Sequence, residues 1–199
     1  RDEAEGYGFD FPETPGDRLR RLREALRVIT LMLNEQRPSF HGRYYSIDRA
    51  LNEPGPVQQP HPPILIGGSG ERVTLRLVAR YGDACNLFGD PERLRHLLGV
   101  LREHCRVVGR DYDAILKTNL GAVVIARDEQ HLQDKLRGID PDGSRREALA
   151  ARVTMGTVEQ VARRIRAFLD AGIQYPIVSF LDPWDEESLY LFRQAVQAA

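Results

Sequence analysis

From residue 64 onward, short apolar runs alternate with longer segments in which apolar residues recur at three- and four-residue steps. This alternation limits the possible folds more than any other feature of the chain. Runs that are apolar throughout are typical of strands buried on both faces, and strands separated by helices form parallel βα units. The predicted strands are residues 64–66, 84–88, a part of 116–126, and 175–181.

Helices are predicted between these strands and after the last one. Asp90 and Pro91 can begin one helix that Gly109 ends, and Thr157 with Gln160 forms a capping box. A polar segment broken by Gly, Pro and Asp, residues 138–146, is predicted to be a loop. The predicted helices are residues 71–81, 90–109, 128–136, 157–172 and 185–198.

The part of the chain before residue 64 is predicted to hold a long helix and a small hairpin. Thr14 can cap the helix, Pro15 suits its first position, and an apolar stripe continues to Leu33. Residues 39–47 are predicted to form the hairpin. Prolines in residues 53–63 favour an extended connector into the first strand, although an exposed segment of this kind could also be a ligand for proline-binding modules.

Four βα units make an open parallel sheet or half of an eight-stranded barrel. A complete barrel needs about 250 residues, whereas the chain has 199. We therefore predict one α/β domain over residues 1–199 that is the C-terminal half of a (β/α)8 barrel. The first residue is Arg1 rather than Met, so we expect the chain to begin partway through a longer protein.

Charge and cysteine content argue against several functional classes. Lys plus Arg number 28 and Asp plus Glu number 29, a net charge of -1, which provides no general attraction to nucleic acid or to an anionic membrane. The sequence contains no run of about 18 apolar residues, the length needed to span a bilayer. Its charged first residues do not resemble a signal peptide. Two cysteines, Cys85 and Cys105, are too few for a disulfide framework. We expect a cytoplasmic protein with reduced thiols.

The sharpest local motif is Gly67-Gly68-Ser69-Gly70, which follows a predicted strand and leads into a helix. Glycines let the backbone approach a ligand closely, and the N–H groups at a helix start favour an anion, of which phosphate is the natural choice. A simple change of chain direction could also explain these glycines. The residues that follow exclude the Walker A motif, the dinucleotide fingerprint and the nucleophile elbow.

No metal site or catalytic group can be identified from the remaining residues. None of the five histidines lies in a metal-binding motif, and surface or capping roles are favoured for them. His41 and His61 lie in predicted loops where a substrate contact is conceivable. Cys85 lies near a strand end, where a reactive thiol is conceivable, but a buried apolar role is favoured.

Several segments together resemble the luciferase-like monooxygenase superfamily, and within it the oxidoreductases that use the deazaflavin coenzyme F420. The glycine motif with its proline-rich lead-in is the strongest of these segments. The resemblance covers nearly the whole chain. The segments that carry it are residues 5–12, 18–33, 40–45, 55–70, 76–86 and 156–161.

The resemblance implies a (β/α)8 barrel of which this chain is the C-terminal half. It places the phosphate of the cofactor at Gly67, Gly68, Ser69 and Gly70, and it places Arg18 and Asn86 near the cofactor. The residues that do acid–base work in such enzymes would lie mostly in the other half, so the catalytic residues remain unassigned.

The implied function is hydride transfer between coenzyme F420 and a small organic substrate, in a protein that is a homodimer at full length. An oxygen-using monooxygenase that binds FMN is the first alternative. A half barrel that binds a flavin or a phosphate without catalysis, as a partner subunit, is the second.

Overall fold

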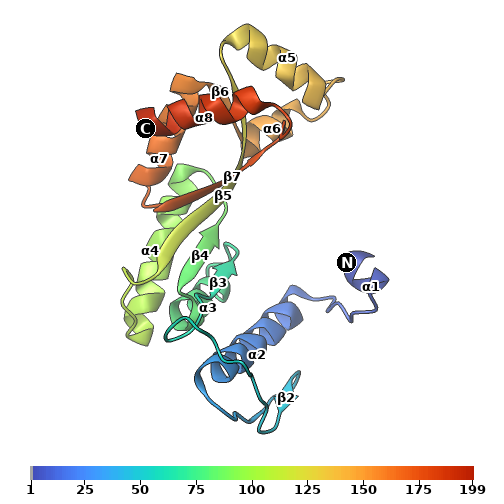
Figure 1. Cartoon of the computed structure of the whole chain (residues 1–199), viewed down its shortest axis with the longest axis vertical. Helices are drawn as coiled ribbons and strands as arrows, with labels where there is room; N and C mark the ends of the chain where they lie inside the picture. The colour runs from blue at the N-terminus through green and yellow to red at the C-terminus, as the bar shows by residue number, and fades with distance from the viewer. Residues whose placement is uncertain (1) are drawn as a thin grey trace.

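The computed structural model describes residues 2–199, and its centre is a five-stranded parallel sheet (Figure 1). The longest strand pairs with three others: with β4 along its first residues, with β7 along its middle and with β6 along its last residues. The strands are β3 (Leu65–Gly67), β4 (Ala84–Leu87), β5 (Leu116–Ala126), β6 (Val153–Thr157) and β7 (Tyr175–Phe180).

The four strands predicted from the sequence are present, and helices alternate with them as expected. The helices that follow β3 are α3 (Thr74–Tyr81), α4 (Pro91–Val108), α5 (Glu129–Ile139), α6 (Arg146–Arg152), α7 (Val158–Asp170) and α8 (Glu186–Ala198). The helix predicted from residue 71 begins later, because residues 71–73 form a turn. The predicted loop 138–146 is shorter than expected, since α5 extends to Ile139 and α6 begins at Arg146.

Strand β6 was not predicted, and the expectation of four strands was therefore wrong. Its sequence, Val-Thr-Met-Gly-Thr, is no continuous apolar run and resembles a loop. The strand forms because β5 extends beyond β4 and leaves an unpaired edge from Ala122 to Ala126, to which β6 binds in parallel.

The N-terminal part contains the predicted helix and hairpin together with a short helix that the sequence did not indicate. Thr14 caps the long helix by accepting a hydrogen bond from the Asp17 N–H at 3.1 Å. Leu22 and Leu26 of this helix pack into the core beside α3. The elements are α1 (Asp2–Gly6), α2 (Pro15–Asn34), β1 (Phe40–His41) and β2 (Ser46–Ile47). Figure 1 shows α2 and β2 at one end of the elongated molecule and α5 at the other.

Helices α3, α4, α7 and α8 cover one face of the sheet, whereas the opposite face is covered by α5 at the end of β5 and is otherwise largely open among the described residues. On the covered face, Leu87 of β4 and Leu94 and Leu97 of α4 are fully buried. On the open face, Leu65, Leu116, Leu120 and Tyr175 are 50%, 43%, 38% and 59% exposed. Strands β3, β6 and β7 each have one described neighbour, so the described sheet does not close into a barrel.

Candidate anion-binding site at the glycine loop

The glycine loop, residues 67–70, connects β3 to the turn that precedes α3. The Gly68 N–H donates to the carbonyl oxygen of Asn86 at 2.9 Å, which continues the pairing between Gly67 and Asn86. Gly68 has a φ of +127°, which side chains rarely adopt, and a Cβ on Gly70 would lie 2.7 Å from Thr74 Oγ1. These two glycines therefore permit a tight connection between strand and helix.

Two backbone N–H groups of the loop are free to bind a ligand. The N–H groups of Ser69 and Gly70 donate to no residue that the structure describes. Both residues line an open groove together with Glu71, Arg72, Arg93 and Leu19 of α2. Free N–H groups ahead of a helix, with two guanidinium groups nearby, are suited to an anion such as phosphate.

The Ser69 side chain has a different role from its N–H group. Its hydroxyl accepts a hydrogen bond from the Phe88 N–H at 3.0 Å and donates to the Phe88 carbonyl oxygen at 3.2 Å. Because the hydroxyl proton is already used, Ser69 can donate to an anion only through its backbone. The same two bonds connect the glycine loop to the loop that follows β4.

Glu71 connects the turn after the glycine loop to α4. Its carboxylate lies 2.7 Å from Arg93 and 3.3 Å from His96. The hydrogen bond from Arg93, followed by that from His96, lowers the pKa of Glu71. His104 Nε2 donates to the Glu71 carbonyl oxygen at 2.7 Å. These contacts could not be predicted from the sequence, because they depend on how α4 packs beside the loop.

The two other predicted cofactor contacts lie at different distances from the loop. Asn86 is adjacent to it, since its backbone oxygen accepts from Gly68, and its side-chain Oδ1 accepts from Thr118 Oγ1 at 3.0 Å. The guanidinium of Arg18 lies over the Phe11 ring, 5.1 Å from its centroid. Within the described part of the chain, no hydrogen bond or ion pair joins Arg18 to the glycine loop, although its neighbour Leu19 lines the groove.

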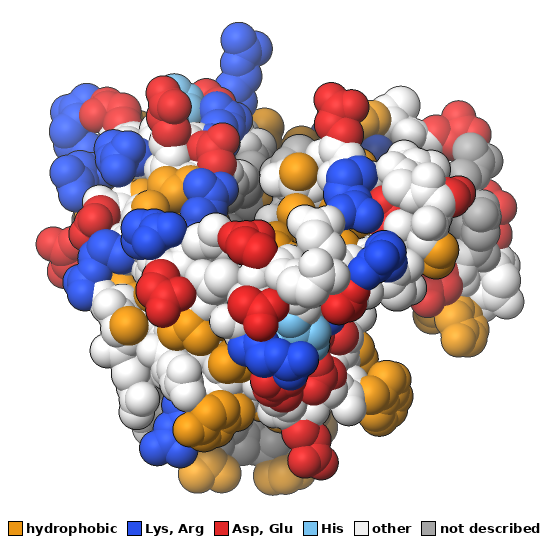
Figure 2. Space-filling model, turned by 90° about the horizontal axis from the view of Figure 1, so that it is seen from above, with side chains coloured by type: hydrophobic (Ala, Val, Ile, Leu, Met, Phe, Trp, Pro, Cys, Tyr) orange, Lys and Arg blue, Asp and Glu red, His pale blue; other side chains and the backbone are white. Residues whose placement is uncertain are grey.

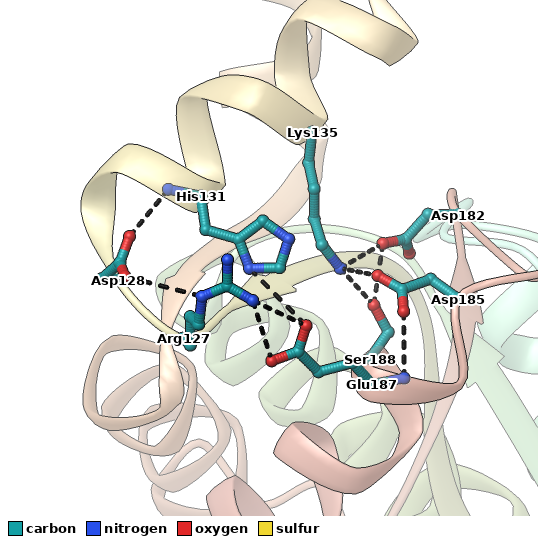
Figure 3. Close-up of polar contacts among 8 residues, drawn as sticks. All are labelled: Arg127, Asp128, His131, Lys135, Asp182, Asp185, Glu187 and Ser188. Atoms are coloured by element: carbon teal, nitrogen blue, oxygen red, sulfur yellow. Dashed lines mark hydrogen bonds and ion pairs between the residues drawn. The ribbon is translucent and has the colours of Figure 1, made fainter.

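A second polar cluster joins α5 to the start of α8 (Figure 3). Ligand-type atoms of His131, Asp185 and Glu187 lie within 4.8 Å of one another, as in some metal sites. Cations of the protein already neutralise both carboxylates: Lys135 Nζ lies 2.6 Å from Asp185, and Arg127 lies 3.2 Å from Glu187. We interpret this cluster as an ion-pair network that fixes the two helices.

The surface near this cluster carries mixed charges. Figure 2 shows Lys and Arg side chains interspersed with Asp and Glu over the face seen from above. Within residues 2–199, no helix is both long enough and apolar enough to cross a membrane.

The chain belongs to the luciferase-like monooxygenase family, whose model matches residues 2–141. An F420-dependent glucose-6-phosphate dehydrogenase of Kineococcus radiotolerans is 34% identical over 119 residues, which are 56% of this chain and 33% of that protein. The enzyme of the same description from Microbacterium testaceum is 26% identical over 92% of this chain and 60% of its own length. An FMNH(2)-dependent dimethylsulfone monooxygenase of Pseudomonas putida is 30% identical over 57% of this chain and 30% of its own length.

Solved structures of similar proteins confirm the fold. An F420-dependent secondary alcohol dehydrogenase in complex with an F420-acetone adduct superposes with a TM-score of 0.78 at 20% identity, over 95% of this chain and 64% of that one. The EDTA monooxygenase of Chelativorans sp. BNC1 superposes with a TM-score of 0.76 at 17% identity, over 98% of this chain and 62% of that one. This chain thus spans less than two thirds of each of these relatives. Its parallel sheet of βα units matches the barrels of luciferase-like enzymes, as the sequence predicted.

Proposed function

We propose that the protein binds coenzyme F420 through the glycine loop and catalyses hydride transfer between this coenzyme and a small organic substrate. The observation that carries the proposal is the pair of free N–H groups at Ser69 and Gly70, in a groove that Arg72 and Arg93 also line. Two relatives whose sequences match this chain are described as F420-dependent.

The proposed role of the loop is to hold a phosphate group. The N–H groups of Ser69 and Gly70 donate to the phosphate oxygens, and the charges of Arg72 and Arg93 offset the negative charge. Arg93 and His96 also hold the Glu71 carboxylate, which reduces its repulsion of the anion. The bound coenzyme supplies the hydride chemistry, while the protein positions and shields it.

A second candidate is an FMN-dependent monooxygenase. The similarity to an FMNH(2)-dependent enzyme favours it, and a phosphate held by the same backbone groups suits either coenzyme. Direct titration of the protein with each coenzyme separates the two candidates.

We also propose that residues 1–199 are one domain, the C-terminal part of a larger barrel. The open sheet face and the strand edges at β3 and β7 support this, as does the share of the relatives that the chain covers. On this proposal the catalytic acid–base residues lie in the other part of the barrel. We further propose a homodimer in the cytoplasm, where the free, buried Cys85 and Cys105 stay reduced.

Replacement of Gly67 tests the phosphate site without disturbing the fold. A Cβ at Gly67 meets nothing within 4 Å, so Gly67→Asp adds a negative charge beside the loop, and Gly67→Asn adds the same shape without charge. We expect Gly67→Asp to weaken F420 binding by about tenfold, or about 1.4 kcal/mol, and Gly67→Asn to weaken it much less. The measurement is a fluorescence titration with F420 and with FMN.

The protein for this titration should include whatever its gene encodes upstream of Arg1. Equal F420 affinities in the Asp and Asn variants would refute the site. Tighter binding of FMN than of F420 would replace the first candidate with the second. Binding of neither coenzyme would refute both.

A further inference from the structure

A pocket of about 470 Å³ lies where β4 ends. The last residue of β4, Leu87, pairs with Asn119 of β5, and β6 first pairs with β5 at Ala122. On this side Leu120 and Gly121 of β5 therefore have no strand beside them, and both line the pocket. Ligands of open parallel sheets bind in such crevices, outside the carboxyl ends of the strands.

Two arginines give this pocket a positive character. Arg152 comes from the end of α6 and Arg164 from α7, and neither forms an ion pair with any residue of the described part of the chain. The Arg164 guanidinium lies over the Phe168 ring, 5.0 Å from the centroid. The carboxylate that lines the pocket is Asp90, whose Oδ1 already accepts the Arg93 N–H at 2.8 Å.

A buried amide and apolar side chains complete the lining. Asn119 is only 4% exposed, and its Nδ2 donates to the Leu87 carbonyl oxygen at 2.8 Å. This bond uses one of the two Nδ2 N–H groups, fixes the side chain and leaves the second N–H as a donor. Phe88, Leu120 and Phe168 contribute apolar surface. The pocket thus combines two cations, one carboxylate, one fixed amide and apolar walls.

We propose that this pocket binds a small organic anion, a carboxylate or a phosphate monoester with an apolar body. Guanidinium groups match the geometry of both anions, and the two guanidinium groups are exposed, unpaired within the described chain and therefore accessible to a ligand. The apolar walls would take the body of the same molecule.

The pocket also shares a wall with the glycine loop. Phe88 lines the pocket and forms both hydrogen bonds with the Ser69 hydroxyl, so one loop separates the two sites. We therefore infer that the anion is the substrate of the enzyme proposed above. This second step rests on the proposed function, whereas the anion pocket itself does not.

The test compares benzoate with benzamide, which has nearly the same shape and no charge. Isothermal titration of the protein should show benzoate binding at least about tenfold more tightly. Arg152→Gln and Arg164→Gln should each weaken benzoate binding about tenfold. Arg166→Gln, an exposed arginine of α7 outside this pocket, is the matched control and should leave it unchanged. Thermal unfolding of each variant shows whether it is folded.

Three results would overturn the anion pocket: equal binding of benzamide and benzoate, no saturable binding of either, or unchanged binding in both pocket variants. The Gly67→Asp variant keeps the two proposals distinguishable, because it should lose coenzyme affinity and retain benzoate affinity. Benzoate should still bind to protein saturated with coenzyme. Its displacement by the coenzyme would show that an acidic group of the coenzyme occupies the pocket, and would overturn the assignment to substrate.

Discussion

Burial decides the chemistry of the Cys85 thiol. Its side chain is fully buried, and removal from water raises its pKa from 9.0 to about 11. At neutral pH the thiol therefore stays protonated and acts as a small apolar group, which is the role that the sequence favoured.

The raised pKa of Cys85 predicts how stability changes in alkaline solution. The unfolded state loses the thiol proton near pH 9, whereas the folded state retains it to about pH 11. Folding therefore becomes less favourable between pH 9 and 11. We expect the free energy of unfolding to fall less over this range in Cys85→Ala than in the wild type, as measured by urea denaturation. Parallel pH profiles of the two proteins would contradict the prediction.

The individual residues of the site were only partly predictable. Gly67, Gly68, Ser69 and Gly70 form the expected loop because their geometry follows from local sequence. Only the structure shows that Gly68 and Gly70 shape the turn and that Ser69 and Gly70 have free N–H groups. The contacts of Glu71 with α4 could not be predicted, because they join residues more than 20 positions apart in the sequence.

The position of α5 depends on a buried lysine. Lys135 Nζ lies 2.6 Å from Asp182, 2.6 Å from Asp185 and 2.6 Å from Ser188 Oγ, and its side chain is 7% exposed. The hydrogen bond from Lys135 lowers the pKa of Asp185. A cation shared by two carboxylates thus joins α5 to the segment between β7 and α8.

Loss of this cation should be costly for stability. Lys135→Met leaves Asp182 and Asp185 without their cation, and breaking a buried pair in this way costs about 3–5 kcal/mol. We expect a value near the lower limit, because Asp185 is 34% exposed. Arg137→Gln, which removes the exposed pair with Asp134 on the same helix, is the control and should cost little. Urea denaturation measures both, and equal losses would contradict the prediction.

Elements with a strong local signal were predictable from the sequence, and those that depend on pairing were not. As expected, α4 is capped by Asp90 and begins with Pro91. It ends before Gly109, whose backbone adopts the left-handed conformation. Strand β6 has no comparable pattern, and it exists because β5 provides an edge. The cluster of His131, Asp185 and Glu187 was missed for a similar reason, since His131 lies on α5 and is far in the sequence from the other two.

At the scale of the molecule, the open sheet face predicts how the chain behaves alone. Leu65, Leu116, Leu120 and Tyr175 expose apolar surface that the interior of a complete barrel would bury. We expect the 199-residue chain to bind a hydrophobic dye such as ANS, and this binding to decrease when the remaining part of the proposed barrel is present. Leu120→Glu should lower the dye fluorescence of the isolated chain. Equal fluorescence with and without that part would contradict the half-barrel proposal.

The βα architecture followed from the alternation of apolar runs, but the lack of closure did not follow from any one residue. It is a property of the whole sheet: β3, β6 and β7 each pair with a single strand, and no described strand joins β7 to β3. The sequence indicated it only through length, because 199 residues are too few for eight βα units.

Strand β5 pairs with β4, β6 and β7, and it thereby joins the half of the molecule around α3 and α4 to the half around α7 and α8. Its amides that bond to β4 are protected by the first half, and those that bond to β6 and β7 are protected by the second. Hydrogen exchange along this strand consequently compares the opening of the two halves within one element, whereas exchange in the flanking helices reports local fraying.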